Sequence, residues 1–335
     1  MQTTKEQEQI IHWSMLHEPG DGLARQIFDL RSTQALEDFQ TGRAQTLWPT
    51  LVGEEYREAI ADMIERIELR YNEQAVIAAI ERGIRWNFRP VFPAEAPGLF
   101  QKLDDLAPHQ PYLLWVAGDL LPFTGDTASV VGTRWPSDQG KENASKLVRQ
   151  LGLPVISGGA IGIDAAAHKA ALANKLRTLA VMAGGLDRAY PQVNWELFHQ
   201  IVQSGGAMIS EMAASAAPTR WRFLQRNRLI AAASSATYVV EAGYKSGSLN
   251  TANHAKMLGR EVFAMVEPKE FAPARGCNAM VSSGLARPYR LGGTVIQDQS
   301  LQLRIADARR NGSKTVRDIA RDSGVPIRLV KAAMR

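Results

Sequence analysis

Four arginines and two aromatic residues lie within nine consecutive positions, in the segment RWRFLQRNR at residues 220–228. A guanidinium group binds a phosphate through two parallel hydrogen bonds, and an aromatic face stacks on a nucleobase. This combination of residue types predicts contact with a nucleic acid. The alternative is a basic helix start whose Trp221 and Phe223 belong to the core, and composition alone does not decide between the two.

Three glycine-bearing turns each follow an apolar run of strand length. They are GTR at residues 132–134, SGGAIGID at residues 157–164 and GG at residues 184–185. Glycine lets backbone N–H groups approach an anion, and the N-terminus of a following helix adds a favourable dipole, so the turns predict phosphate binding. The second turn has glycines spaced GGxxG and is followed by Lys175 and Arg177 rather than by an acidic residue, which argues against a nicotinamide cofactor.

A fourth turn, EAGYKSGS at residues 241–248, combines glycine, hydroxyl groups and a lysine ahead of a helical stretch. Such a turn suits phosphate oxygens. It lacks the GxxxxGK[ST] order of a nucleoside triphosphatase loop, so ATP hydrolysis by that mechanism has no support. Glu241 stays a candidate acid, which is either catalytic or orients its neighbours.

Side chains that serve metal or nucleophilic chemistry are scattered along the chain. Asp164 and His168 are four positions apart on one predicted helix face, but no second histidine or cysteine lies nearby in the sequence. A structural hydrogen bond is therefore the favoured role for this pair. The single cysteine, Cys277, belongs to no Cys-His pattern. We expect no metal, no cofactor and no catalysis.

Six apolar runs must position these turns. From residue 128 onward they are ASVVGT, LPVISG, RTLAVMAG, AMISE, ATYVVEA and EVFAMV, and helical stretches of about 10 to 15 residues separate them. This alternation is typical of βαβ units in a parallel sheet, whose ligands bind at the carboxyl ends of the strands. We therefore predict a Rossmann-like α/β domain at residues 89–298, with a mostly parallel sheet and helices on both faces.

The two ends of the chain differ from this middle part. Residues 1–88 carry apolar positions at helical spacing, such as Ile60, Ile64 and Ile67, and predict a small helical N-terminal domain. Residues 299–335 predict a short helix-turn-helix-like segment. The chain thus divides into three predicted parts.

Charge is distributed unevenly within the net charge of +5. Residues 1–125 hold 11 Lys and Arg against 19 Asp and Glu, residues 126–300 hold 19 against 12, and residues 301–335 hold 9 against 3. The basic charge therefore lies where a polyanion is predicted to bind. No apolar run approaches the roughly 20 residues that span a bilayer, and the first residues lack the features of a secretory signal, so we expect a cytoplasmic protein without membrane insertion.

Seven segments occur in the order seen in the DprA/Smf family of DNA-processing proteins, across roughly residues 85–290. They are VVGTRWPSDQG, SGGAIGIDAAAHKAAL, LAVMAGGLDRAYPQVNWELF, MISEM, RFLQRNRLIAAAS, VVEAGYKSGSLNTANHA and GREVFAM. The chain resembles this family. The resemblance implies a Rossmann-like domain that binds single-stranded DNA, forms a homodimer and helps to load RecA recombinase onto incoming strands during natural transformation.

By matching position, the resemblance also implies which residues contact DNA. The set comprises Gly132, Arg134, Ser157, Gly158, Gly159, Gly162, Arg226, Asn227, Arg228, Lys245, Ser246 and Gly247, with Lys175 as an addition. The chain departs from the family pattern at Leu224, where proline is usual, and at residues 266–267, where Pro-Gly is usual. The helical N-terminus resembles the extension that many members carry, and the C-terminal segment resembles the first part of a winged-helix domain.

Two other interpretations stay open. The sheet and its turns are also similar to those of the lysine-decarboxylase-like phosphoribohydrolases, which cleave nucleoside monophosphates with an Arg and a Glu near a PGGxGT turn. The corresponding turn here lacks that glycine pair and leaves Glu241 as the candidate acid. A nucleotide sensor or defence component is the other interpretation. With few aromatic residues beside the arginines, we expect phosphate contacts to dominate affinity, with little base specificity and a steep salt dependence.

Overall fold

The computed structural model describes residues 3–268, 271–291, 308–309, 315–323 and 330. The chain divides into two compact units, residues 1–288 and residues 289–335. Within the second unit, helix α15 (Val316–Ser323) contributes Ile319 and Ala320 to a small apolar cluster with Ala308 and Val330. Most of the predicted helix-turn-helix-like segment lies outside the described residues. None of the described helices is long and apolar enough to cross a membrane.

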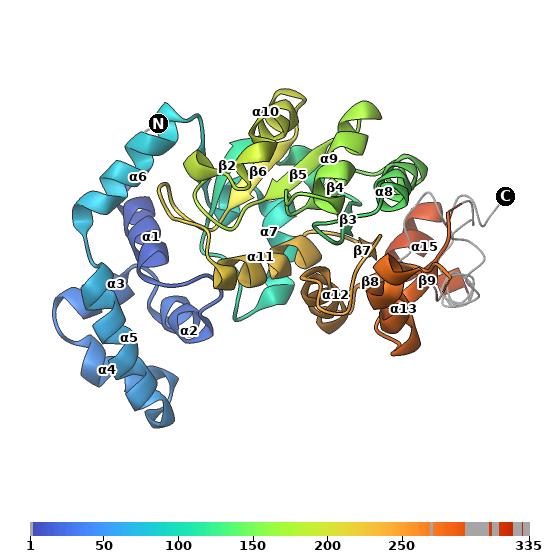
Figure 1. The fold of residues 1–335 in the computed structure, drawn as a ribbon. Helices are drawn as coiled ribbons and strands as arrows, with labels where there is room; N and C mark the ends of the chain where they lie inside the picture. The colour runs from blue at the N-terminus through green and yellow to red at the C-terminus, as the bar shows by residue number, and fades with distance from the viewer. Residues whose placement is uncertain (1–2, 269–270, 292–307, 310–314, 324–329, 331–335) are drawn as a thin grey trace. The chain divides into compact units, whose positions relative to one another are not determined.

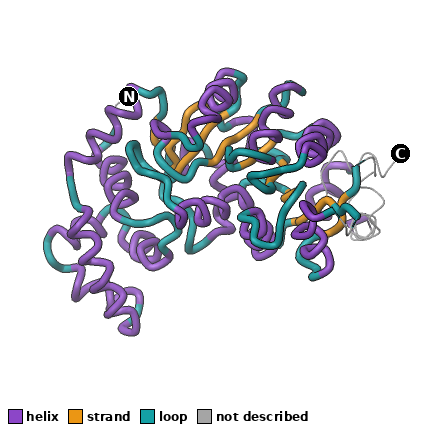
Figure 2. Tube along the Cα trace, in the orientation of Figure 1, coloured by secondary structure: helices purple, strands orange, loops and turns teal. Residues whose placement is uncertain are grey.

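The N-terminal part of the first unit is helical, as the apolar spacing predicts (Figure 2). Its helices are α1 (Lys5–Leu16), α2 (Gly22–Arg31), α3 (Gln34–Gln40), α4 (Ala44–Val52), α5 (Arg57–Arg70) and α6 (Glu73–Arg85). Their apolar faces enclose a core in which Trp13, Trp48 and Ile67 are buried. Helices α1 and α6 also add Ile11 and Val76 to the apolar layer that covers the sheet, so these helices pack on the sheet directly.

All six apolar runs form strands of one nine-stranded sheet, with the order β1-β2-β6-β5-β4-β3-β7-β8-β9. The strands are β1 (Arg89–Val91), β2 (Leu114–Gly118), β3 (Ala128–Val131), β4 (Val155–Ser157), β5 (Thr178–Val181), β6 (Ala207–Ser210), β7 (Ala236–Val239), β8 (Glu261–Met265) and β9 (Arg287–Tyr289). Strands β3 to β8 pair in parallel, whereas β2 pairs antiparallel with both β1 and β6. The predicted Rossmann-like, mostly parallel sheet is confirmed.

Helices cover both faces of this sheet (Figure 1). One layer holds α8 (Asp138–Leu151), α9 (Ile163–Ala173) and α10 (Trp195–Gln203), and the other holds α7 (Pro97–Leu103), α11 (Arg220–Ala232), α12 (Ser248–Met257) and α13 (Arg275–Ser282). Every residue of β3, β4, β5 and β6 is buried between these layers. Double-sided burial explains why the strands are continuous apolar runs in the sequence.

The order of the strands reverses between β3 and β7. From β3 the chain builds the sheet outward through β4, β5 and β6, and it then returns to place β7 and β8 on the other side of β3. Ligands of open α/β sheets bind outside the carboxyl ends of the strands at such a reversal. The turns after β3, β4 and β7 all lie at this edge, which is where the predicted phosphate contacts belong.

Two buried histidines predict how stability depends on pH. Burial lowers the pKa of His17 to about 4 and that of His168 to about 3, both below the ordinary value of 6.5. As the pH falls, the two histidines are protonated in the unfolded chain before they are protonated in the folded protein. Their contribution to stability is therefore fully present above pH 6.5 and is lost as the pH falls towards the folded pKa values. We expect the free energy of unfolding to fall by up to about 1.4 kcal/mol per pH unit for each histidine below pH 6.5.

Urea unfolding between pH 7.5 and 5 measures this slope. A His199→Gln variant is the control, because His199 is exposed and its loss should leave the slope unchanged. A stability that stays constant from pH 6.5 to 5 would contradict the burial of His17 and His168 as neutral groups.

Candidate nucleic-acid interface

The turns after β3 and β4 interlock. Gly162 has φ +90°, and a Cβ atom there would lie 2.4 Å from the carbonyl oxygen of Thr133 and 2.8 Å from the backbone of Arg134. The first backbone N–H of α9, that of Ile163, donates to the same Thr133 oxygen at 3.1 Å. Only glycine combines this conformation with so close an approach. The two turns are therefore one structural feature, from which Arg134 projects.

Glu241, which follows β7, connects the turn after β7 to the turns after β3 and β4. The backbone N–H of Thr133 donates to the carbonyl oxygen of Glu241 at 2.7 Å. The Glu241 carboxylate is buried and accepts hydrogen bonds from the backbone N–H of Ser137 at 2.9 Å and from its hydroxyl at 2.6 Å. Ser137 in turn caps α8 by accepting from the N–H of Gly140. Glu241 thus orients the start of α8, which is the second of the two roles that its position in the sequence allowed.

Arg226, on helix α11, links the end of β4 to the end of β5. Its side chain is buried, and Nη1 donates to the carbonyl oxygens of Gly158, at 2.6 Å, and Val181. Burial lowers the pKa of Arg226 to about 10, against the opposing effect of the Asp164 carboxylate, so the guanidinium stays charged at neutral pH. Burial also raises the pKa of Asp164, while the charge of Arg226 acts in the opposite direction. These contacts within the protein account for the buried position of Arg226. Its predicted contact with DNA stays a prediction.

Asn227 and Arg228 are also buried, each with its own partners. The Asn227 amide donates to the carbonyl oxygen of Gly247 at 3.4 Å and to Asn250 Oδ1 at 3.0 Å, which fixes the turn that carries Lys245. Arg228 forms a bidentate ion pair with Glu211, with both N–O distances 2.6 Å. A phosphate would have to displace Glu211 to reach Arg228, so that predicted contact stays a prediction. We call Asp164, Arg226, Asn227, Arg228 and Glu241 the buried frame.

Exposed cations and aromatic rings, together with the half-buried Phe223 ring, lie beside this frame. Arg134 is exposed, and its Cζ lies 5.1 Å from the centre of the Phe223 ring. The same ring packs edge-to-face against Tyr190, with centroids 5.8 Å apart. Trp135 is 83% exposed, although large aromatic side chains are normally covered, and Lys245 is exposed on the turn that Asn227 fixes. We call Arg134, Trp135, Tyr190, Phe223 and Lys245 the outer surface.

Trp135 and Tyr190 were missed in the sequence, where Phe223 was one of only two aromatic residues noted beside the arginines. Trp135, Tyr190 and Phe223 come from three separate segments, and only the fold brings them to one edge. A local signal exists for Trp135, because it directly follows Arg134 in a glycine turn. Tyr190 has no such signal, since its turn reads as an ordinary helix connection.

The remaining predicted residues divide into near and distant ones. Gly247 is exposed and Ser246 half-buried on the turn of Lys245, whereas Ser157 is buried and donates to the carbonyl oxygen of Val130 at 2.7 Å. Lys175 is exposed between the end of α9 and the start of β5. Because α9 runs away from the carboxyl edge, Lys175 lies at the opposite edge of the sheet, and the structure does not bring it to the predicted site.

Asp164 and His168 make separate hydrogen bonds. His168 Nδ1 lies 2.7 Å from the Thr178 hydroxyl, and Asp164 accepts weakly from the backbone N–H of Ala160 at 3.4 Å. Both residues thus have structural partners. In the part of the chain that the structure describes, no three His, Cys, Asp or Glu side chains gather closely enough to hold a metal ion.

Glycine turns meet where the strand order reverses, beside exposed arginine, lysine and aromatic side chains, and this arrangement on a Rossmann-like sheet is suited to phosphate groups. Residues 91–299 match the family model described as DNA recombination-mediator protein A. The chain belongs to this family, which confirms the resemblance stated from the sequence.

Individual relatives agree with this assignment. The chain is 42% identical over 181 residues to a putative DNA processing protein DprA of Mycobacterium tuberculosis, a match that covers 52% of this chain and 46% of the relative. It is 36% identical over 195 residues to the DNA processing protein DprA of Bacillus subtilis, covering 57% and 63%. The chain thus matches about half the length of the first of these relatives.

Two solved structures are also similar. The DNA processing protein A of Streptococcus pneumoniae superposes with a TM-score of 0.66 at 27% identity and covers 87% of this chain and 96% of its own. The Helicobacter pylori protein gives a TM-score of 0.54 at 27% identity, covering 60% and 90%, and its structure was described for its single-stranded DNA binding mode.

Proposed function

We propose that the protein binds single-stranded DNA along the outer surface and passes it to RecA recombinase as a recombination mediator. The observation that carries the proposal is the group of exposed cations and aromatic rings beside the point where the strand order reverses. In this assignment Arg134 and Lys245 contact phosphates, while Trp135 and Tyr190 stack on bases. The described DNA-binding mode of the Helicobacter pylori relative supports it.

Aromatic stacking is what makes the proposed binding selective for single strands. In a duplex the bases are already stacked and paired, so their faces are not available to Trp135 or Tyr190. Single-stranded and duplex DNA, in contrast, both expose their phosphate groups. The protein should therefore bind a single strand more tightly than a duplex, with modest base preference and a strong dependence on salt.

We also propose that the protein acts by binding and not by catalysis. The nucleotide-cleaving alternative needs a carboxylate free to act on a substrate, and Glu241 is the candidate acid. Both of its oxygens are instead engaged by Ser137, and its side chain is 2% exposed. That geometry favours a binding protein over the enzyme.

The mediator role, homodimerisation and a cytoplasmic location belong to the same proposal and rest on the family membership. The test is RecA filament assembly on single strands that are coated beforehand with a single-stranded DNA-binding protein. We expect the protein to shorten the lag of assembly severalfold, because it holds the strand while RecA nucleates. Tight binding of the strand with an unchanged lag would refute the mediator role and leave DNA binding intact. Light scattering of the protein alone would report whether it is a dimer.

A further inference from the structure

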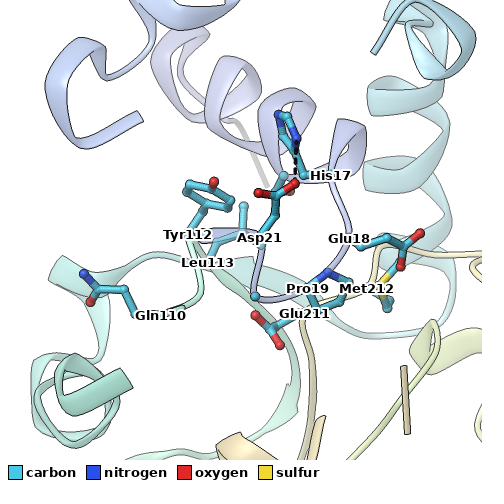
Figure 3. A pocket seen from close by; sticks show the side chains of 11 residues that line it. His17, Glu18, Pro19, Asp21, Gln110, Tyr112, Leu113, Glu211 and Met212 are labelled. Carbon is cyan, nitrogen blue, oxygen red and sulfur yellow. Dashed lines mark ion pairs between the residues drawn. The ribbon is translucent and has the colours of Figure 1, made fainter. Parts of the chain in front are cut away.

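A groove lies between the N-terminal helices and the first turn of α11. It has a volume of about 270 Å³ and is lined by residues 16–21, by Arg66 and Arg70 of α5, and by Trp221 of α11. Figure 3 shows His17, Glu18, Pro19 and Asp21 in an adjoining pocket, which Tyr112 and Glu211 also line. We call the first cavity the N-terminal groove.

Ion pairs hold the groove in shape. Glu18 accepts two hydrogen bonds from Arg222, both at 2.9 Å, and one from Arg70 at 3.0 Å. Burial alone would raise the pKa of Glu18, but Arg222 and Arg70 lower it below its usual value, so the carboxylate stays ionised. Asp21 is engaged as the N-cap of α2, where it accepts from the N–H of Ala24. The carboxylates of Glu18 and Asp21 therefore already have hydrogen-bond partners within the protein.

Two groups in the groove remain open to a ligand. Trp221 is 56% exposed, and no ring contact is found for it among the described residues. Arg66 is exposed and, among the residues that the structure describes, makes no hydrogen bond or ion pair. An open indole beside an unpaired guanidinium is the pair of groups that binds one nucleotide, by stacking on the base and contacting the phosphate.

The first turn of α11 lies between the groove and the outer surface, so a strand that occupies both would pass across the N-terminal end of this helix. Trp221 and Phe223 lie in the same first helical turn, about 3 Å apart along the helix axis at 1.5 Å per residue. Phe223 faces the outer surface through Arg134 and Tyr190, whereas Trp221 lines the groove. Arg220, exposed at the start of the helix, adds a further cation at this junction.

We propose that the N-terminal groove is a second subsite for the same DNA strand, in which Trp221 stacks on a base and Arg66 binds the adjoining phosphate. This inference rests on the proposed single-stranded DNA binding. The N-terminal region is acidic as a whole, and the exposed Arg66 supplies positive charge that attracts the strand to the groove. The helical N-terminal part of the chain thereby lengthens the binding site.

Strand length separates the two sites experimentally. Fluorescence anisotropy with the full chain would compare an oligothymidine of about 5 nucleotides with one of about 20, since single-strand sites span about 4–16 nucleotides. We expect Trp221→Ala to weaken binding of the long strand about fivefold or more and to leave the short strand unchanged. Arg66→Ala should reduce the salt slope for the long strand by about 0.7, the value for one phosphate contact.

The control is Arg85→Ala, which removes an exposed arginine of α6 that does not line the groove. Unchanged binding of the short strand by the Trp221 and Arg66 variants shows that they are folded. Equal long-strand affinity in wild type and both variants, or equal losses on both strands, would overturn the second subsite while the proposed function stands. A wild type that binds neither strand would overturn both proposals.

Discussion

Replacing Arg226 by methionine is expected to lower the free energy of unfolding by about 3 to 5 kcal/mol, the cost of removing one partner from a buried charged network. The guanidinium donates to the carbonyl oxygens of Gly158 and Val181 and faces the buried Asp164. Methionine fills a similar volume, but it removes the hydrogen-bond donor from both carbonyl groups and the positive charge from the surroundings of the buried carboxylate. Urea unfolding followed by circular dichroism measures the loss.

The same variant should also lose most of its affinity for single-stranded DNA, because the ends of β4 and β5 support the turns that carry the outer surface. Binding is measured where the variant is still folded. Arg149→Met is the matched control, since Arg149 is exposed on α8, and we expect it to change stability by less than about 0.5 kcal/mol. An Arg226→Met protein that unfolds at the same urea concentration as the wild type would show that the buried frame does not depend on this guanidinium.

Much of the fold follows from local pattern. The six runs from ASVVGT to EVFAMV are strands because double-sided burial requires continuous apolar sequence, and each is short enough to exclude a helix. Parallel strands then bring their carboxyl ends to one edge. This is why the turns at Gly132, Gly158 and Lys245 could be assigned to one site before any contact between them was known.

The division of that site into a buried frame and an outer surface could not be predicted. The triplet of Arg226, Asn227 and Arg228 reads as a basic patch, because a charged side chain in a sequence is normally exposed. Its burial depends on partners far away in the chain, such as Gly158 and Glu211. Such partners are set by tertiary packing, which local sequence does not encode.

Lys175, added to the DNA contacts that the resemblance implies, lies away from the other predicted residues. It follows the glycine turn at residues 157–164 closely in sequence but not in space. The 11 residues of α9 separate the two and carry the chain across the sheet, to the amino end of β5. At 1.5 Å per residue this is roughly 16 Å, more than a lysine side chain spans. The structure therefore places Lys175 at the amino ends of the parallel strands, and its predicted DNA contact stays a prediction.

The N-terminal helices also gained a role that their sequence did not suggest. They read as a separate acidic domain, yet Glu18 pairs with Arg222 of α11, and Arg82 pairs with the buried Asp187 after β5. Both contacts join the helices to segments beside the outer surface. A polar pair of this kind spans more than 100 residues of sequence, so no local pattern reveals it.

The central claim is that Arg134 and Lys245 hold single-stranded DNA on the outer surface. Fluorescence anisotropy of labelled single-stranded and duplex oligonucleotides, over a series of salt concentrations, would compare the wild type with an Arg134→Ala, Lys245→Ala double variant. Both side chains are exposed, and neither makes a hydrogen bond or an ion pair within the part of the chain that the structure describes, so the variant should keep most of its stability. An Arg149→Ala, Lys175→Ala double variant matches the change in charge away from the site.

We expect the wild type and the control to bind the single strand at least about tenfold more tightly than the duplex, since stacking contributes about 1–3 kcal/mol per base. The Arg134 and Lys245 variant should bind more than about tenfold more weakly, with a salt slope smaller by about 1.4, which corresponds to two lost phosphate contacts. Equal affinity for both forms of DNA, or unchanged binding by this variant, would contradict the account.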